Sequence, residues 1–298
     1  METISVLGVA LELRQIAPPL PAAGTAARAP IVFLHEGLGS VAQWQGKGGY
    51  WPAQVCAATG RAGWVYSRQG YGQSDTVVDV RGPSRGLNGQ RQGRLQPDYL
   101  HREAYVVLPE LLRLLGIERP VLLGHSDGGS IALLYASRFA AEACVVLAPH
   151  VLVEDISLRA IAAARDAYLA STHAPSGLRQ RLARYHHDVD CAFWQWNDVW
   201  LSEGFRNFDI RAECSRITAP VLAIQGHEDP YGSMLQIDAI AQALEAAPDA
   251  SIRSIKGPQC PPNVRVQLQK LEHCGHAPHK DQSAQSWQCV SEFLAPLG

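Results

Sequence analysis

The chain has 298 residues, of which 47% are hydrophobic and 18% charged, and its formal net charge is −2. This composition excludes a disordered chain, and a charge so close to zero argues against a nucleic-acid partner. No apolar run approaches the roughly 18–20 residues of a membrane span, so we expect no membrane partner. The seven cysteines show no C-x-x-C spacing, and the first residues lack the pattern of a signal peptide; both features favour a cytoplasmic location.

Short apolar runs alternate with helical patterns along most of the chain. Buried strands are predicted at 31–34, 64–67, 121–123, 143–148 and 221–224, and a strand-like alternation occurs at 264–271. Helical spacing predicts helices at roughly 98–116, 128–138 and 233–247, the first with a kink at Pro109. This order is typical of an α/β fold, in which helices cover both faces of a mainly parallel sheet.

The alternation breaks between about 150 and 215, where only helical and loop patterns occur. We expect a helical cap at 150–215, lying over one edge of the sheet and inserted into a core formed by 1–149 and 216–298. Its aromatic residues, above all Trp194 and Trp196, suggest a substrate pocket for small acyl or aryl groups. Packing of the cap onto the sheet would explain these aromatic residues equally well.

Two further stretches resemble surface loops. Residues 81–97 carry four arginines among Gly, Pro, Asn and Gln, and residues 256–263 are rich in turn formers. The basic loop is predicted to be a solvated surface, with a site for an anionic substrate as the alternative.

The segment VLLGHSDGG at 121–129 contains the strongest functional pattern in the chain. An apolar strand leads into a G-x-S-x-G motif, and a helix-forming run follows. Ser126 is therefore predicted on a tight strand-to-helix turn, where the glycines let neighbouring backbone approach closely. Such a turn places the hydroxyl beside a helix N-terminus, whose free N–H groups favour a developing oxyanion. Ser126 is our candidate nucleophile.

A serine nucleophile needs a base that a third group orients, and for this turn the chain order is Ser, acid, His. Carboxylates follow the strand at 221–224, and Asp229 is our candidate acid, with Glu228 as the alternative. His276 is our candidate base. The imidazoles and the thiol at 273–279 lie too close in sequence to form two separate ligand pairs, so we expect no metal and no other cofactor.

The oxyanion also needs a second N–H donor, which usually comes from the loop after an early central strand. Here that loop reads HEGLGS at 35–40. We predict an oxyanion hole formed by the backbone N–H groups of Gly37 and Asp127, with a simple glycine-rich turn as the alternative. The loop lacks the G-x-G-x-x-G pattern and the Lys-Ser/Thr ending of phosphate-binding loops.

These segments resemble the α/β-hydrolase superfamily over nearly the whole chain: HEGLGS at 35–40, SRQGYGQSD at 67–75, GHSDGG at 124–129, GHED at 226–229 and GHAPHKDQ at 275–282. The resemblance implies an eight-stranded, mostly parallel sheet with a helical cap and a Ser126–His276–Asp229 triad. It is nearest to small bacterial esterases and to valacyclovir-hydrolase-like and C–C-bond hydrolases. Haloalkane dehalogenases and epoxide hydrolases carry Asp at the position of Ser126 and are disfavoured.

Two residues depart from the usual family pattern. Glu36 replaces the glycine of the common His-Gly pair, and Asp127 follows the nucleophile. In valacyclovir-hydrolase-like enzymes the acid at this second position recognises a substrate amino group. Together, Glu36 and Asp127 would favour a cationic or amine-bearing substrate. In the alternative interpretation, Asp127 complements the helix dipole and Glu36 is solvated or internally paired.

The predicted function is hydrolysis of a small carboxylic ester, thioester or lactone through an acyl-enzyme. The expected partner is a small-molecule substrate, and a homo-oligomer is compatible with the sequence. Three alternatives stay open: a cofactor-free C–C hydrolase of a ring-cleavage product, an amino-acid ester or amide hydrolase, and a ligand-binding protein with vestigial chemistry.

Overall fold

The computed structural model describes residues 2–18, 28–78, 80–81, 96–170, 176–246 and 265–297. Most of the predicted basic loop and the whole predicted turn-rich stretch at 256–263 lie outside these ranges. Within them, eight strands form one sheet in the order β1-β2-β6-β3-β7-β8-β9-β10. These strands are β1 (Glu2–Val6), β2 (Val9–Ile16), β3 (Ile31–Leu34), β6 (Gly63–Tyr66), β7 (Val121–His125), β8 (Ala143–Leu147), β9 (Val221–Gly226) and β10 (Val266–Leu271).

The sheet is antiparallel at one end and parallel elsewhere. β2 pairs antiparallel with β1 and with β6, whereas every other neighbouring pair is parallel. The predicted eight-stranded, mostly parallel sheet is therefore confirmed. All the strands predicted from apolar runs are present, with shifts of a residue or two at their ends. The antiparallel pair β1–β2 was not predicted; β1 is mostly exposed, so it lacks the apolar run that marks the buried strands.

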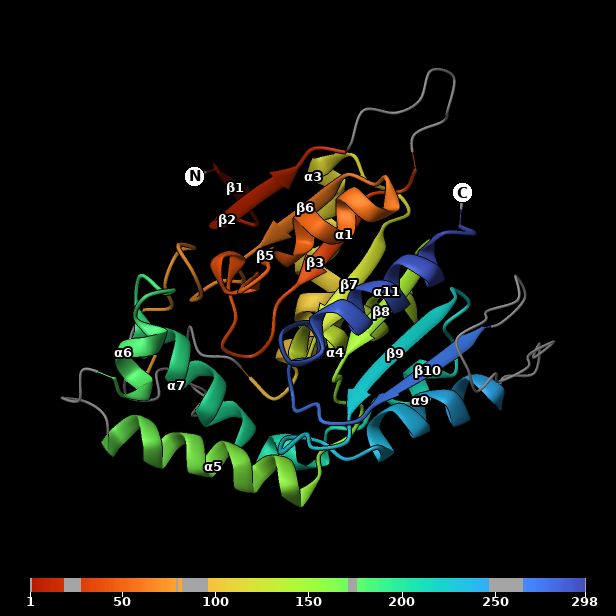
Figure 1. The fold of residues 1–298 in the computed structure, drawn as a ribbon. Coiled ribbons are helices and arrows are strands. Elements are labelled where there is room, and N and C mark those ends of the chain that lie inside the picture. The colour runs from red at the N-terminus through yellow and green to blue at the C-terminus, as the bar shows by residue number, and fades with distance from the viewer. Residues whose placement is uncertain are drawn as a thin grey trace.

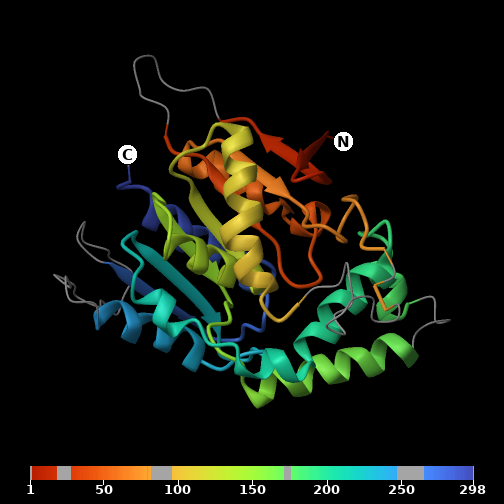
Figure 2. The same ribbon diagram turned by 180° about the vertical axis from the view of Figure 1, so that it is seen from behind.

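Two layers of helices cover the sheet (Figures 1 and 2). α1 (Trp51–Thr59) and α11 (Ser283–Leu294) lie on one face, and α3 (Leu108–Leu115), α4 (Asp127–Ala136) and α9 (Leu235–Glu245) lie on the other. Along β3, Ile31 and Phe33 join the apolar cluster of the first face, while Val32 and Leu34 join that of the second. Successive side chains of a strand point to opposite faces, so a strand covered on both sides is apolar throughout.

The helix predicted at 98–116 is interrupted in the middle. It consists of α2 (Tyr99–Arg102), a π-helical turn (Glu103–Val107) and α3. The π turn directly precedes the first turn of α3, where Pro109 lies, and proline has no N–H to donate to an α-helical hydrogen bond. The irregularity expected at Pro109 thus takes the form of a π turn.

Helices fill the chain between β8 and β9. They are α5 (Asp155–Ala170), α6 (Leu178–Leu182), α7 (Val189–Trp200), a 3₁₀ helix (Glu203–Asn207) and α8 (Arg211–Cys214). In its described residues this segment adds no strand to the sheet, and its backbone pairing is limited to one isolated bridge between Leu152 and Asp209. Figure 1 shows α5 and α7 beyond the carboxyl ends of the central strands, where β3, β7 and β9 end.

Short elements complete the described fold. Val41–Trp44 forms a 3₁₀ helix, β4 (Gln45–Gly46) and β5 (Gly49–Tyr50) pair as a small separate sheet, and α10 (Pro278–Asp281) precedes α11. None of the helices in the described ranges combines the length and the apolar composition needed to cross a membrane.

Leu123 tests how strongly the sheet core stabilises the fold. It lies on β7 and is fully buried, whereas Leu114 on α3 is 41% exposed. We expect Leu123→Ala to lower the free energy of unfolding by about 2–5 kcal/mol, because it leaves a cavity between the sheet and its helices. Leu114→Ala serves as the matched control and should change it by about 0.5 kcal/mol or less. Urea denaturation measures both values, and equal losses would contradict the assignment of Leu123 to the core.

Candidate active site

Ser126 occupies the turn between β7 and α4. Its backbone has φ 54° and ψ −117°, a conformation that non-glycine residues rarely adopt. Its N–H donates to the carbonyl of Leu147 on β8 at 2.9 Å, so the turn is tied to the neighbouring strand. The predicted strained strand-to-helix turn is present.

Two glycines make this turn sterically feasible. A Cβ atom on Gly124 would lie 2.1 Å from the carbonyl oxygen of Gly128, and one on Gly128 would lie 2.0 Å from the carbonyl oxygen of Leu34. Real Cβ atoms do not approach backbone oxygens so closely, so any other residue would push β3, β7 and α4 apart. The spacing of the two glycines is thus a requirement of packing.

Three side chains from distant parts of the sequence meet at the turn. His276 Nε2 lies 2.9 Å from Ser126 Oγ, and His276 Nδ1 lies 2.9 and 2.8 Å from the two carboxylate oxygens of Asp229. A carboxylate can only accept, so Nδ1–H donates to Asp229 and leaves Nε2 to accept the hydroxyl proton of Ser126. The structure brings the three predicted residues into one chain of hydrogen bonds.

Local hydrogen bonds hold the Asp229 carboxylate in place. The N–H of Tyr231 donates to Oδ1 at 2.8 Å, and the side-chain amide of Gln225 donates to Oδ2 at 2.6 Å. Glu228, the alternative acid, is 65% exposed and lies 3.4 Å from His273 Nδ1. Its carboxylate therefore faces another histidine, and Asp229 alone of the two acids contacts His276.

The pKa of His276 reflects a balance of opposing effects. Burial disfavours the charged imidazolium and lowers its pKa, but the hydrogen bond and the negative charge of Asp229 raise it, helped by the carboxylate of Glu36. The net effect is a pKa above the ordinary value of 6.5. The same contact with His276 lowers the pKa of Asp229 despite its burial, so this carboxylate stays ionised.

A cavity lies above Ser126, with about 400 Å³ of empty space, part of which is open to solvent. Its walls combine Ser126, the loop after β3 and the helices between β8 and β9. The lining residues are Glu36, Gly37, Leu38, Ser126, His150, Ile161, Trp196, Trp200, Tyr231 and His276.

The loop 35–40 is held against this cavity from two sides. The buried guanidinium of Arg68 donates to the carbonyl of His35 at 2.6 Å and to that of Glu36 at 2.9 Å. On the other side, His186 lies 2.9 Å from the carbonyl of Leu38. Its Nδ1 accepts from a backbone N–H, so its Nε2 carries the proton donated to this carbonyl. These hydrogen bonds hold the loop in place, and its Gly37 lines the same cavity as Ser126.

Gly37 also allows a close approach between this loop and α7. A Cβ atom there would lie 2.2 Å from Nε1 of Trp196. The predicted pocket residue Trp196 therefore covers the loop directly. Trp200, one turn further along α7, lines the same cavity, and the i, i+4 spacing of the two tryptophans is the signal that places them on one helix face.

Trp194 does not line the cavity, in contrast to our expectation. Its ring packs edge-on against Phe193, and the Arg81 guanidinium lies 3.7 Å above it. Arg81 also lies 3.3 Å from a carboxylate oxygen of Asp198. Trp194 lies two residues before Trp196, and residues two apart on a helix point in different directions, so both could not line one cavity.

The Asp127 side chain is bound inside the protein. It is fully buried, accepts a hydrogen bond from the Tyr99 hydroxyl at 2.6 Å and lies 3.8 Å from Arg68. It is not among the cavity-lining residues. Tyr99 and Arg68 both contact Oδ2, while Oδ1 is buried without a hydrogen-bond partner among the described residues. The complete burial of the side chain away from the cavity lining favours the internal role at the helix N-terminus over contact with a substrate amine.

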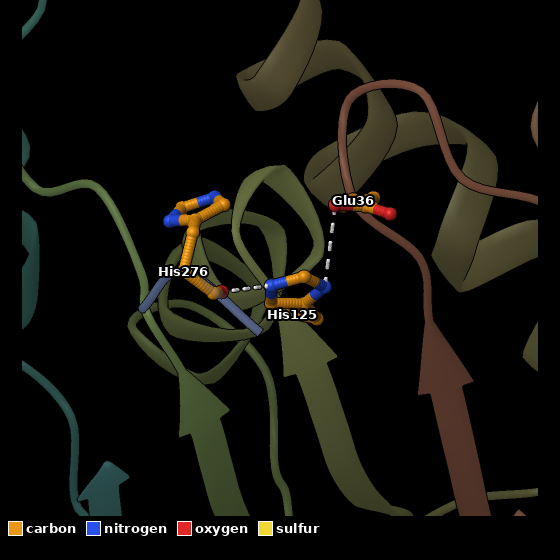
Figure 3. A group of neighbouring side chains, drawn as sticks. All are labelled: Glu36, His125 and His276. Atoms are coloured by element: carbon orange, nitrogen blue, oxygen red, sulfur yellow. Dashed lines mark hydrogen bonds and ion pairs between the residues drawn. The ribbon is translucent and has the colours of Figure 1, made fainter. Parts of the chain in front are cut away.

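Glu36, His125 and His276 lie close together (Figure 3). Their potential ligand atoms are within 4.8 Å of one another, the one such group found in the described ranges. His125 Nε2 lies 2.6 Å from the His276 carbonyl oxygen. The two ring nitrogens of His276 already have hydrogen-bond partners, since Nδ1 contacts Asp229 and Nε2 contacts Ser126. A metal ion here would have to displace Ser126 from His276, so the arrangement fits proton transfer better than metal binding.

We predict that Asp229 sets the titration of His276. As a general base His276 must be neutral, so the deprotonated fraction rises as pH increases through its raised pKa. Asp229→Asn removes the charge that raises this pKa but leaves the burial that lowers it, so the pKa should fall. NMR titration of the His276 ring measures the shift. Glu228→Gln is the matched control and should leave it unchanged; a pKa in Asp229→Asn equal to the wild-type value would refute this account.

Comparisons with known proteins place the chain in a family. Among solved structures, similar folds include a carboxylesterase of the ammonia-oxidizing thaumarchaeon Nitrososphaera gargenis (15% identity, TM-score 0.66, covering 99% of this chain and 98% of that one). The enol-lactonase of Burkholderia xenovorans LB400 is 18% identical, with TM-score 0.63, and the match covers 98% of this chain and 99% of that one.

The meta-cleavage product hydrolase of Pseudomonas fluorescens IP01 is 16% identical, with TM-score 0.59, and the match covers 100% of this chain and 98% of that one. At these identities the likeness shows a shared fold. A search among curated proteins gave no significant match. The model of the alpha/beta hydrolase family matches residues 31–285, which include every candidate catalytic residue, and the chain therefore belongs to this family.

Proposed function

We propose that the protein is a serine hydrolase that cleaves a small carboxylic ester, thioester or lactone through an acyl-enzyme. The observation that carries this proposal is the chain of hydrogen bonds from Ser126 through His276 to Asp229 at the floor of a cavity. This arrangement supplies a nucleophile, a base and a group that orients the base.

In the proposed mechanism, the Ser126 oxygen attacks the substrate carbonyl while His276 Nε2 takes its proton. Asp229 stabilises the imidazolium that forms. When the tetrahedral intermediate collapses, His276 returns the proton to the leaving alcohol, thiol or ring oxygen, and the acyl group remains on Ser126. Water, deprotonated by His276, then attacks the acyl-enzyme and releases the acid and free Ser126.

The backbone N–H groups of Gly37 and Asp127 are our proposed oxyanion hole. Asp127 is the first residue of α4, where N–H groups have no intrahelical acceptor and the helix dipole favours negative charge. Gly37 lines the cavity together with Ser126, on the loop that Arg68 and His186 hold in place. Two such donors aimed at one oxygen would stabilise the oxyanion.

We also propose that residues 150–215 act as a cap on a core formed by 1–149 and 216–298. Trp196 and Trp200 from this segment complete the wall of the cavity above Ser126. The aromatic walls of the cavity suit a small acyl or aryl group. The six cysteines in the described ranges are free, five of them buried, which supports our proposal of a reducing, cytoplasmic location.

Substitution of the triad tests the proposal. Ser126→Ala and His276→Ala should each lower kcat for short p-nitrophenyl esters by about 10⁴-fold or more, because they act as one unit. Asp229→Asn should cost about 10³–10⁴-fold, since Glu228 faces away from His276 and provides no substitute. Stopped-flow absorbance should show a burst of p-nitrophenol if the acyl-enzyme accumulates.

The matched control is Ser291→Ala, which removes a serine hydroxyl from α11 on the protein surface and should leave the rates unchanged. A fluorophosphonate probe should label wild type and the control but not Ser126→Ala. Full activity in Ser126→Ala would refute the proposal. Turnover of a ring-cleavage dienone without turnover of any ester, thioester or lactone would instead select the C–C hydrolase.

A further inference from the structure

One carboxylate lines the candidate active-site cavity. Glu36 precedes the proposed oxyanion residue Gly37, and its side chain is 25% exposed. Within the described part of the chain, the lining contains no lysine or arginine. An ionised group in such a place needs a counterion or a hydrogen-bond donor.

The nearest basic group does not neutralise Glu36. His125 Nδ1 lies 3.6 Å from the carboxylate (Figure 3), whereas His125 Nε2 lies 2.6 Å from the carbonyl oxygen of His276. A carbonyl only accepts, so the proton is on Nε2. Burial lowers the pKa of His125 to about 4, so the ring is neutral and Nδ1 presents a lone pair toward Glu36. Two acceptors thus face each other, so His125 in this tautomer donates no hydrogen bond to Glu36.

The other charges near the nucleophile are already paired. Asp127 lies against Arg68, and Asp229 faces His276, which becomes positive during catalysis. The Arg68 guanidinium is bound to the carbonyls of the loop 35–40 and is not among the cavity-lining residues. Burial raises the pKa of Glu36, but the positive charges around it, including those of Lys280 and Arg68, outweigh this effect and lower the pKa, so the carboxylate is ionised. An oxyanion formed in the cavity would therefore add a second negative charge beside Glu36.

Aromatic rings line the cavity together with Glu36. Trp196, Trp200 and Tyr231 line the same cavity. The indole N–H of Trp200 donates to the Tyr99 hydroxyl at 3.0 Å, outside the cavity lining, so the ring contributes apolar surface and π electrons rather than a donor. Rings of this kind attract an ammonium group, most strongly where water is excluded.

We propose that the cavity recognises a positively charged ammonium group of the substrate, with Glu36 as its counterion and the aromatic rings around it. The cation would balance the carboxylate when the oxyanion forms, whereas an anionic substrate would be repelled. This inference rests on the proposed ester hydrolysis and names its substrate class. Asp127 has no part in the recognition.

Matched esters test the selectivity. Acetylcholine carries a trimethylammonium group, 3,3-dimethylbutyl acetate is its uncharged isostere, and 4-acetoxybutanoate carries a carboxylate. For wild type we expect kcat/KM for acetylcholine to exceed that for the neutral ester at least tenfold, with the anionic ester the poorest substrate. Glu36→Gln keeps the shape of the side chain and should bring the three values to within about threefold.

Glu110→Gln is the control, because it removes the same charge from α3, where the Glu110 side chain is 27% exposed and pairs with Arg113, and it should retain the full preference. Equal kcat/KM for the cationic and neutral esters in wild type, or an undiminished preference in Glu36→Gln, would overturn the proposal.

Binding gives a second test that does not require turnover. Trp196 and Trp200 line the cavity, so quenching of tryptophan fluorescence can report ligands in the Ser126→Ala variant. Choline should bind at least tenfold more tightly than 3,3-dimethyl-1-butanol, and Glu36→Gln in the same background should abolish that difference. Equal binding of the two alcohols would refute the ammonium site. If Ser126→Ala keeps wild-type esterase activity, the proposed function fails, while the choline measurement still decides whether the ammonium site exists.

Discussion

The backbones of β3, β7 and α4 approach one another so closely at Ser126, the candidate nucleophile, that no side chain fits between them. Only glycine fits at positions 124 and 128, since a Cβ atom at Gly124 or Gly128 would lie about 2 Å from a carbonyl oxygen. At this contact Ser126 has a strained backbone with a positive φ, and its hydroxyl lies at the carboxyl ends of the strands. His276 and the cavity walls are arranged around that one fixed point.

Electrostatic pairing decides which acidic groups can act on a ligand. Asp229 is bound to His276, and Asp127 is bound to Tyr99 beside Arg68. Both carboxylates are almost completely buried and depend on these partners, because an unpaired charge in the interior is costly. Glu36 differs, since its nearest basic neighbour is a neutral imidazole and its side chain remains partly exposed at the cavity. The three carboxylates of this site thus have three different environments.

Several features were predictable because they depend on local sequence. The strands covered on both faces are continuous apolar runs, so β3, β7 and β9 could be recognised, whereas the exposed β1 could not. Ser126 could be placed because its turn needs glycines at fixed offsets. His276 and Asp229 could be named from chain order, although their distances to each other depend on loops that no local pattern describes.

The amino-acid sequence by itself determined the α/β architecture, the position of Ser126 and the candidates for acid and base, since periodicity, glycine spacing and chain order are local properties. Only the tertiary structure decided which neighbours each side chain meets. Trp196 lines the cavity and Trp194 does not. Asp229 rather than Glu228 contacts His276. Asp127 is buried against Tyr99, whereas Glu36 lines the cavity. The physical reason is that charge pairing and cavity lining depend on contacts between segments far apart in the chain.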